Sequence, residues 1–125
     1  MLQINGRKIP AEAYFLNKAQ HRHVIKIYEL FATENHYVYV MQRPEICEDL
    51  SRVLLKRTLT ENEARKYFIQ ILQANICLEE KGVLHRDLKP ANILVDMESD
   101  EIKIIDFGLA SEVQYEPYNV FRGET

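Results

Sequence analysis

Apolar residues recur at helical spacing near the start of the chain, at Phe15, Leu16 and Ala19. Pro10 precedes them and suits the first turn of a helix, because an N–H at that position would lack an intrahelical partner. A turn signal, Asn5-Gly6, comes before Pro10. The pattern predicts a short helix that begins near Pro10 and ends before residues 21–23.

Two stretches rich in β-branched and aromatic residues follow, at 24–31 and 36–41. The short polar segment 33–35 separates them, so they predict a β-hairpin. Two shorter apolar runs, 93–95 and 102–105, flank a polar turn at 97–101 and predict a second pair of strands. The combination of helices with short strands indicates an α+β fold.

The longest predicted helix begins at Thr60, because Thr60 and Glu63 have the spacing of a capping box. Lys81-Gly82 supplies a cationic, glycine-terminated end. Between these ends one wide apolar side consists of Ala64, Tyr67, Phe68, Ile71, Leu72, Ile76 and Leu78.

The composition fits a single domain, with 125 residues of which 46% are hydrophobic. A net charge of −3 supplies no large basic footprint, so we expect no nucleic-acid partner. No apolar run approaches the roughly 20 residues that span a bilayer, and the N-terminus lacks a signal-peptide pattern. We therefore expect no membrane partner and a cytoplasmic location, with the nucleus as a second possibility.

The two cysteines, Cys47 and Cys77, fall in the middle of predicted helices and have neither metal-site nor disulfide spacing. Buried thiols in a reducing compartment are the expectation.

The most specific pattern in the chain is His85-Arg86-Asp87-Leu88-Lys89-Pro90-Ala91-Asn92, followed by Asp106-Phe107-Gly108. These residues fit H-R-D-L-x-x-x-N and D-F-G, the catalytic loop and metal-binding turn of protein kinases. The chain therefore resembles a eukaryotic-type protein kinase domain. Phosphoryl transfer depends mainly on positioning and on neutralising phosphate charge, which explains why so few side chains carry it.

The resemblance implies a role for each polar residue of these motifs. Asp87 would accept the proton of the substrate hydroxyl, while Asn92 and Asp106 would hold Mg²⁺ on the phosphates of ATP. Lys89 would meet the γ-phosphate, and a lysine there is typical of serine/threonine kinases. The implied cofactors are ATP and Mg²⁺, and the implied partners are proteins with Ser or Thr acceptors.

Glu12 matches the glutamate of kinase helix αC that pairs with a lysine on the third strand. The alternative is an ordinary solvent-facing helix glutamate. No V-A-I-K precedes Glu12, and Lys8 is expected at the start of the same helix. No G-x-G-x-x-G is present either. We therefore expect the first three kinase strands to be missing from this chain.

The residues at the position of the kinase hinge, which joins the two lobes, point to a particular kinase family. Residues 41–45 occupy the hinge position, and Arg43-Pro44-Glu45 followed by Asp49-Leu50 resembles the Pim kinases. Pro44 has no N–H, which leaves the carbonyl of Gln42 as the expected backbone contact to adenine. Met41 would be the gatekeeper and Leu94 the floor beneath adenine. The expected ATP-binding residues are Glu12, Met41, Gln42, Asp49 and Leu94.

Pim kinases also favour basic peptides, using acidic side chains that include two between the catalytic lysine and asparagine. This chain has Pro90 and Ala91 at those two positions, so we expect a weaker preference for arginine-rich peptides. Asp49 is the acidic residue expected to retain part of it.

The resemblance further implies a regulatory spine that links the two lobes through Leu16, Ile27, His85 and Phe107, although each is also simply a core residue. Residues 109–125 resemble an activation segment that stops before an A-P-E motif. Ser111, Tyr115 and Tyr118 are hydroxyls within it, to which we assign no role.

The expected organisation is a partial kinase domain: a remnant small lobe at 1–42, a hinge at 43–46 and the start of a mostly helical large lobe at 47–125. The expected function is a Pim-like serine/threonine kinase whose chain is by itself inactive. The alternative is a truncated, catalytically inactive fragment or binding module. A small-molecule phosphotransferase of the same fold is disfavoured, because such enzymes rarely carry H-R-D-L-K-x-x-N.

Overall fold

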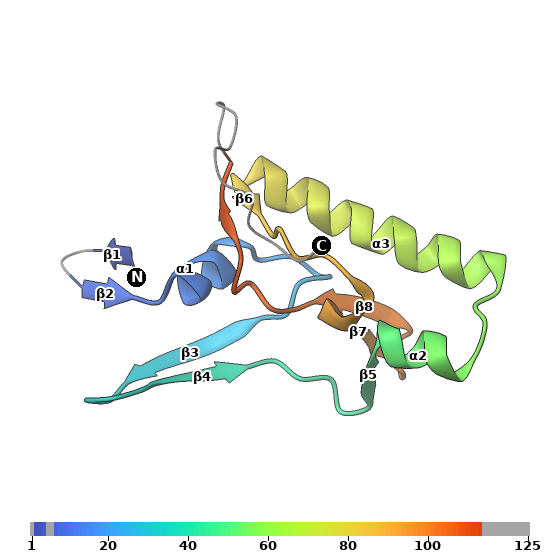
Figure 1. Ribbon diagram of the computed structural model, residues 1–125, viewed down its shortest axis with the longest axis horizontal. Coiled ribbons are helices and arrows are strands. Elements are labelled where there is room, and N and C mark those ends of the chain that lie inside the picture. The colour runs from blue at the N-terminus through green and yellow to red at the C-terminus, as the bar shows by residue number, and fades with distance from the viewer. Residues whose placement is uncertain (1, 5–6, 114–125) are drawn as a thin grey trace.

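The computed structural model describes residues 2–4 and 7–113 and has the α+β class that the sequence predicts (Figure 1). Three α-helices and several small antiparallel sheets alternate along the chain. The helices are α1 (Ala11–Lys18), α2 (Leu50–Lys56) and α3 (Glu61–Glu80). The strands are β1 (Leu2–Ile4), β2 (Arg7–Ile9), β3 (Ile27–Ala32), β4 (Tyr37–Met41), β5 (Cys47–Asp49), β6 (Val83–Leu84), β7 (Ile93–Asp96), β8 (Glu101–Ile104) and β9 (Ser111–Glu112), and a 3-10 turn, η1, spans Pro90–Asn92.

The first helix forms where the apolar spacing predicts it. Pro10 lies directly before α1, and its carbonyl accepts a hydrogen bond from Tyr14 N at 3.2 Å. Lys8, expected at the start of the helix, lies instead on β2, which pairs with β1. β2 has only three residues, which is too short for a strand periodicity to show in the sequence. Its pairing with β1 is what defines it as a strand. The expected turn at Asn5-Gly6 lies outside the described residues.

The predicted hairpin is confirmed as β3 and β4, with Leu30 opposite Tyr39 and Ala32 opposite Tyr37. β3 begins at Ile27, three residues later than the pattern suggests, and its register with β4 shifts between Ile27 and Glu29.

The segment between α1 and β3 connects α1 and the β3–β4 hairpin to β8 through backbone hydrogen bonds. Ile25 N donates to Ile104 O at 2.9 Å, and Ile104 N donates to His23 O at 2.8 Å. Val24 forms a parallel bridge with Ile104. These backbone bonds hold the N-terminal helix and hairpin against the second half of the chain.

The second pair of strands is also confirmed, as β7 and β8, and β5 extends it to a three-stranded sheet in the order β5-β7-β8. Cys47 therefore lies on a strand, opposite Asp96, and the prediction that it lies within a helix is wrong. The partner of β5 is far along the chain, so the local sequence carries no signal for this pairing. Asp49 ends the strand and caps α2 by accepting from Arg52 N at 3.0 Å.

The capping box at the start of α3 is present as predicted. Thr60 Oγ1 accepts from Glu63 N at 3.1 Å, and a Glu63 carboxylate oxygen accepts from Thr60 N at 3.1 Å. The helix ends at Glu80, and Gly82 follows in the left-handed region with φ of 77°. This conformation favours glycine and turns the chain into β6.

Only part of the apolar side of α3 is buried. Tyr67, Ala74 and Leu78 are buried where α3 packs against β8 and β6. These strands cover only one flank of the helix, so part of its apolar side stays exposed. The exposed large apolar residues of α3 are Phe68, Ile69, Leu72 and Ile76.

One hydrophobic core runs through both halves of the molecule. It contains Leu16 of α1, Val53 of α2, Leu78 of α3, Ile104 of β8 and Phe107, each almost fully buried. The core therefore holds the segment after β8 at the centre of the fold.

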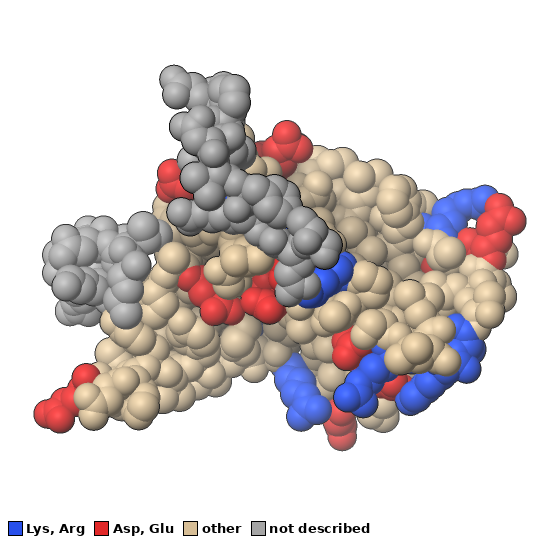
Figure 2. Space-filling model, in the orientation of Figure 1, with Lys and Arg blue, Asp and Glu red and all other residues tan. Residues whose placement is uncertain are grey.

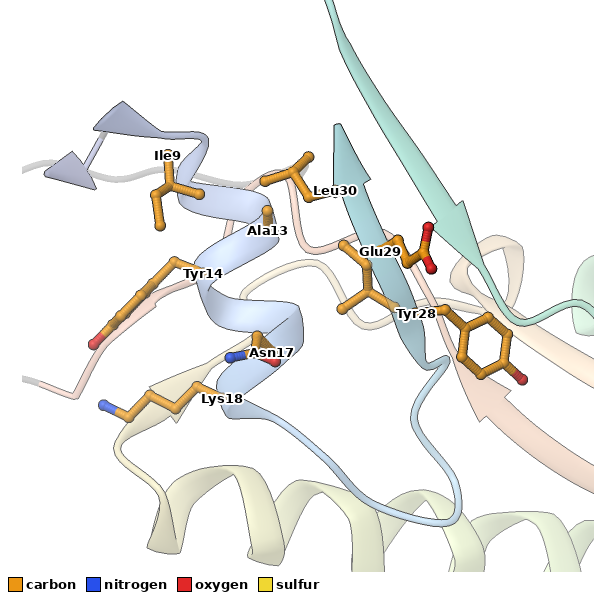
Figure 3. Close-up of a pocket in the computed structure, with 9 residues that line it drawn as sticks. Ile9, Ala13, Tyr14, Asn17, Lys18, Tyr28, Glu29 and Leu30 are labelled. Atoms are coloured by element: carbon orange, nitrogen blue, oxygen red, sulfur yellow. The ribbon is translucent and has the colours of Figure 1, made fainter. Parts of the chain in front are cut away.

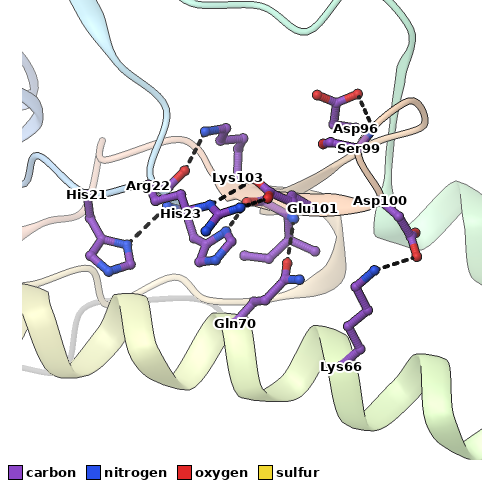
Figure 4. Close-up of polar contacts among 11 residues, drawn as sticks. His21, Arg22, His23, Lys66, Gln70, Asp96, Ser99, Asp100, Glu101 and Lys103 are labelled. Atoms are coloured by element: carbon purple, nitrogen blue, oxygen red, sulfur yellow. Dashed lines mark hydrogen bonds and ion pairs between the residues drawn. The ribbon is translucent and has the colours of Figure 1, made fainter.

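Polar contacts fix the β7–β8 turn on α3 (Figure 4). Tyr67 Oη donates to Asp100 Oδ1 at 2.5 Å, and Lys66 Nζ donates to Asp100 Oδ2 at 2.9 Å. Gln70 Oε1 accepts from Ile102 N at 2.8 Å. Burial, followed by the hydrogen bond to Asp100, raises the pKa of Tyr67 to about 12, so this hydroxyl stays a donor at neutral pH.

Basic side chains gather at the end of the molecule formed by α2 and the start of α3 (Figure 2). Each has an acidic partner: Arg52 pairs with Asp49, Lys56 with Glu48, Arg57 with Glu63 and Arg65 with Glu61. These cations are therefore largely balanced locally. Within the described ranges, no helix combines the length and apolar character needed to cross a membrane.

Thr60→Ala should lower the free energy of unfolding by about 1 kcal/mol, because it removes the side-chain acceptor that caps α3. Chemical denaturation measures the change, and Thr58→Ala, in the exposed loop just before the cap, is the matched control. Equal losses in the two variants would contradict the assigned capping role.

Candidate functional site

A cleft of about 760 Å³ lies where α1, β4 and the hinge meet the β5-β7-β8 sheet and the end of β8. Its lining comprises Glu12, Ile25, Tyr39, Met41, Gln42, Arg43, Cys47, Glu48, Asp49, Arg52, Leu94, Ile105 and Asp106. All five residues predicted at the ATP site line it, and so does Asp106 of the D-F-G motif. The fold therefore gathers into one cavity residues that are up to 94 positions apart, from Glu12 to Asp106.

Several residues that line the cleft were not predicted from the sequence, and Tyr39 on β4 is one of them. The alternation of strand β4 could have indicated it, because Tyr39 and Met41 are two residues apart and share a face. Burial, followed by the charge of Glu12, raises the pKa of Tyr39. Cys47 and Glu48 gave no such signal, since their strand was itself unrecognised.

Asp87 and Asn92 are hydrogen-bonded to each other in the segment that follows β6. Asn92 Nδ2 donates to the backbone oxygen of Asp87 at 2.9 Å and to its carboxylate Oδ2 at 3.0 Å. The 3-10 turn η1 brings them together, because Asn92 N donates to Lys89 O at 2.9 Å. Lys89 Nζ lies 3.9 Å from Asp87 Oδ1. Asp87, Lys89 and Asn92 do not line the cleft, but the backbone oxygen of Asn92 accepts a hydrogen bond from Ile105, which does.

His85 connects this loop to the segment after β8. Its Nδ1 accepts from Asp87 N at 3.1 Å, so its Nε2 carries the proton and donates to Ile105 O at 2.8 Å. The ring packs edge-on against Phe107, with centroids 4.7 Å apart. Burial lowers the pKa of His85, which favours the neutral ring that this bonding requires.

A backbone bond places Asn92 next to the D-F-G segment. Ile105 N donates to Asn92 O at 2.9 Å, and Asp106 follows directly. Asp106 has φ of 61°, and its Oδ1 accepts from Gly108 N at 3.1 Å. Arg86 also has a positive φ, 71°. Such backbone conformations are uncommon outside glycine and concentrate at functional sites.

Glu12 faces the same cleft as Asp106. Burial, followed by the charge of Asp106, raises the pKa of Glu12. Among residues 9–113, the part of the chain whose side chains the structure describes, no lysine, arginine or histidine forms an ion pair with Glu12. The two carboxylates therefore give the cleft a negative wall that a cation would stabilise.

Asp49 is engaged in local bonds at the edge of the cleft. Its Oδ1 accepts from Ser51 Oγ and from Arg52 N, and its Oδ2 lies 3.7 Å from Arg52 Nε. These hydrogen bonds lower the pKa of Asp49. Its charge is thus shared with the helix start and with Arg52.

The four residues expected to form a spine lie in or beside the core. Leu16, His85 and Phe107 are buried, and Ile27 packs against the core from β3. The ring contact between His85 and Phe107 joins two of them directly.

A second hollow, of about 620 Å³, lies between α1 and β3 on another part of the surface (Figure 3). It is lined by Ala13, Tyr14 and Lys18 of α1 and by Tyr28 and Leu30 of β3, among others. None of the residues predicted at the ATP site lines it.

Comparison with known protein families matches residues 2–125 to the protein kinase domain. The chain belongs to the protein kinase domain family. The α+β arrangement of this kinase-family chain is accordingly that of a partial protein kinase domain.

Individual relatives agree. The chain is 38% identical over 103 residues to "Putative CBL-interacting protein kinase 13" of Oryza sativa subsp. japonica, which covers 82% of this chain and 20% of that protein. It is 35% identical over 105 residues to "Serine/threonine-protein kinase pim-2" of Danio rerio, covering 82% and 34%. It is 38% identical over 109 residues to "Probable serine/threonine-protein kinase KIN1 homolog" of Enterocytozoon bieneusi (strain H348), covering 87% and 18%.

These relatives represent several kinase families at nearly the same identity. They establish the domain family and do not distinguish the Pim family that the hinge suggests. The chain spans between 16% and 34% of the length of the relatives that it matches.

Lowering the pH from 7.5 to 5.5 should reduce the free energy of unfolding of the parent chain more than it reduces that of a His85→Gln variant. The folded-state pKa of His85 is lowered from 6.5, so the unfolded state binds more protons and the free energy of unfolding falls as the pH drops below about 6.5. Gln keeps one acceptor and one donor and does not titrate. Denaturant titrations at several pH values measure both, and parallel pH dependences would contradict the assigned role.

His21, whose pKa is also lowered, contributes in the same direction. It is present in both proteins, so the difference between their pH dependences isolates His85.

Proposed function

We propose that this chain is the central part of a serine/threonine protein kinase that transfers the γ-phosphate of ATP to Ser or Thr side chains of proteins. The observation that carries the proposal is the convergence of three polar residues beside one cleft. Asn92 is bonded to the Asp87 carboxylate and, through its backbone oxygen, to the residue before Asp106. An acceptor for a hydroxyl proton and two oxygen donors for a metal thus lie together.

The donor set fits Mg²⁺. The Asn92 amide directs its NH₂ group toward Asp87, which leaves its carbonyl oxygen as the atom that would bind a metal ion. Asp106 offers a carboxylate at the cleft wall, and hard oxygen ligands suit this cation. When bound, Mg²⁺ would neutralise charge on the ATP phosphates.

Asp87 is the residue proposed to orient the substrate hydroxyl and accept its proton. The hydrogen bond from Asn92 fixes the carboxylate, and the side chain is only 11% exposed. Lys89, 3.9 Å from Asp87 Oδ1, is proposed to meet the γ-phosphate. Serine/threonine specificity rests on this lysine and on the names of relatives such as the pim-2 and KIN1-homologue proteins.

Adenine is proposed to lie between Met41 and Leu94, which both line the cleft. Pro44 offers no N–H, so a backbone contact from the hinge would use the Gln42 carbonyl. We further propose a Pim-like kinase, supported by Arg43-Pro44-Glu45 and by the similarity to pim-2. The division into small lobe, hinge and large lobe remains part of this proposal.

Asp87→Asn, introduced into a full-length kinase that contains this chain, should lower turnover by several orders of magnitude and leave Mg-ATP affinity nearly unchanged. Asp87 is outside the cleft lining, whereas the nucleotide-site residues are within it. Steady-state kinetics and ATP titration measure the two quantities. Asp96→Asn, on the β7–β8 turn, is the matched control, and turnover within a few-fold of the parent would refute the role.

The second candidate is a catalytically inactive kinase-like module. It is favoured by Glu12, which has no cationic partner among the side chains of residues 9–113 and whose pKa is raised by burial and then by the charge of Asp106. Phosphate positioning supplies most of the catalysis, so residues 1–125 alone should transfer no phosphate to a generic peptide. Transfer by this chain that Asp106→Ala abolishes would show that Glu12 needs no lysine partner.

The peptide preference should be less basic than in typical Pim kinases. Pro90 and Ala91 replace two acidic positions, and the Asp49 charge is partly offset by Arg52. Ala91→Glu in the full-length kinase should increase selectivity for arginine-containing peptides by about threefold, and Ala91→Gln should not. A peptide array measures both; a strong arginine preference in the unmodified kinase would overturn the expectation.

A further inference from the structure

A third, smaller cavity of about 250 Å³ lies behind the hinge, between the segment after α1 and strand β8. The residues that line it are Leu16, Gln20, His21, Arg22, Val24, Ile25, Lys26, Ile27, Gln42 and Lys103. Gln42 and Ile25 also line the proposed ATP cleft, so the two cavities adjoin, but the cations of this cavity do not line that cleft.

The lining of this cavity carries positive charge only. Arg22, Lys26 and Lys103 contribute three cations, and no aspartate or glutamate is among the lining residues. The nearest acidic partner is Glu101, which pairs with Arg22 from outside the lining (Figure 4). Lys26 forms no ion pair with the described residues, and its Nζ lies 5.7 Å from the Tyr28 ring centroid.

The lowered pKa of His21 is consistent with an excess of positive charge around this cavity. Burial lowers its pKa first, and the charges of His23, Lys81 and Lys103 lower it further. No acidic group offsets these contributions. Its Nδ1 accepts from His23 N at 3.0 Å, so the neutral ring carries its proton on Nε2 and keeps a donor there.

Backbone and side-chain bonds hold the cavity in shape. Gln42 N donates to Lys26 O at 2.7 Å, and Gln42 Oε1 accepts from Lys26 N at 3.3 Å. Lys103 Nζ donates to Arg22 O, and this bond joins β8 to the segment after α1. Each cation therefore stands on a backbone that is already ordered, which reduces the entropy lost on binding a ligand.

We propose that this cavity binds a phosphate group, supplied either by inorganic phosphate or by a phosphorylated side chain of a peptide. A phosphate monoester carries nearly two negative charges at neutral pH and three strong acceptor oxygens. Cationic donors bind such a group through charge-assisted hydrogen bonds. This site lies apart from the ATP cleft, and its test does not depend on catalysis.

The test is a phosphate titration of the isotope-labelled chain, followed by amide and histidine ring NMR signals. Ionic strength is held constant with chloride, because screening alone moves the signals of charged groups. Signals of Lys26, Lys103 and His21 should shift together and saturate, and the pKa of His21 should rise. His36, in the β3–β4 turn, is the internal control.

The rise in the His21 pKa must be read against every charge around it. The cations Arg22, Lys26, Lys81 and Lys103 and the neighbouring His23 are present in the free and bound states, as is Glu101 on Arg22. A difference between titrations with and without phosphate therefore isolates the added anion.

Lys26→Gln and Lys103→Gln should each weaken phosphate binding by about fivefold, whereas Lys56→Gln on α2 should not. Lys103 also bonds a backbone oxygen, so Lys26→Gln keeps the test decisive if the other variant unfolds. A phosphoserine peptide that binds more tightly than inorganic phosphate would identify a phosphorylated segment as the source, and its unphosphorylated form is the control. Signals that shift only near Asp87 and Asp106, or that do not saturate, would overturn the proposal.

Discussion

The neutral ring of His85 holds the centre of this molecule together. One ring nitrogen accepts from the Asp87 amide, the other donates to the Ile105 carbonyl, and the ring forms a T-shaped contact with Phe107. These three contacts link the loop after β6 to the segment after β8. A charged ring would place a proton on both nitrogens and lose the bond to Asp87, so burial of an uncharged histidine is a condition for this geometry.

The cleft itself exists because two separate backbone connections meet at β8. One edge of β8 pairs with β7, and the end of the strand exchanges bonds with the segment around Val24. α1 and the β3–β4 hairpin are thereby held over the sheet, and Glu12 comes to face Asp106. Burial, followed by the charge of Asp106, raises the pKa of Glu12, and the two carboxylates form a negative wall. This electrostatic arrangement suits a site that holds metal-bound phosphates.

Behind the hinge the charge has the opposite sign. Lys26 and Lys103 line a cavity with no acidic side chain in its lining, and neither forms an ion pair with a described residue. Arg22 of the same lining pairs with Glu101, and the cations of α2 and the start of α3 are each paired with a carboxylate. Pairing removes most of the attraction that a cation has for an external anion. The contrast between paired and unpaired cations is therefore what distinguishes the cavity behind the hinge from the rest of the basic surface.

Several features follow from the sequence because their causes are local. The capping box at Thr60, the β3–β4 hairpin and the β7–β8 pair depend on residues within a few positions of each other, and each forms as predicted. The spacing from His85 to Asp106 likewise indicated the kinase family, which the comparison with known domains confirms. The residues expected at the ATP site were inferred from that resemblance, and the fold brings all five to one cleft.

Tertiary structure decided the rest, because the causes lie far apart along the chain. Cys47 became part of a strand through pairing with Asp96, which lies 49 positions further along the chain. Asp49 caps α2 through its neighbours Ser51 and Arg52, but its place beside Leu94 in the cleft follows from the pairing of β5 with β7. The cavity behind the hinge joins residues 20–27 to Lys103, and no spacing rule connects positions that meet only after the sheet has formed.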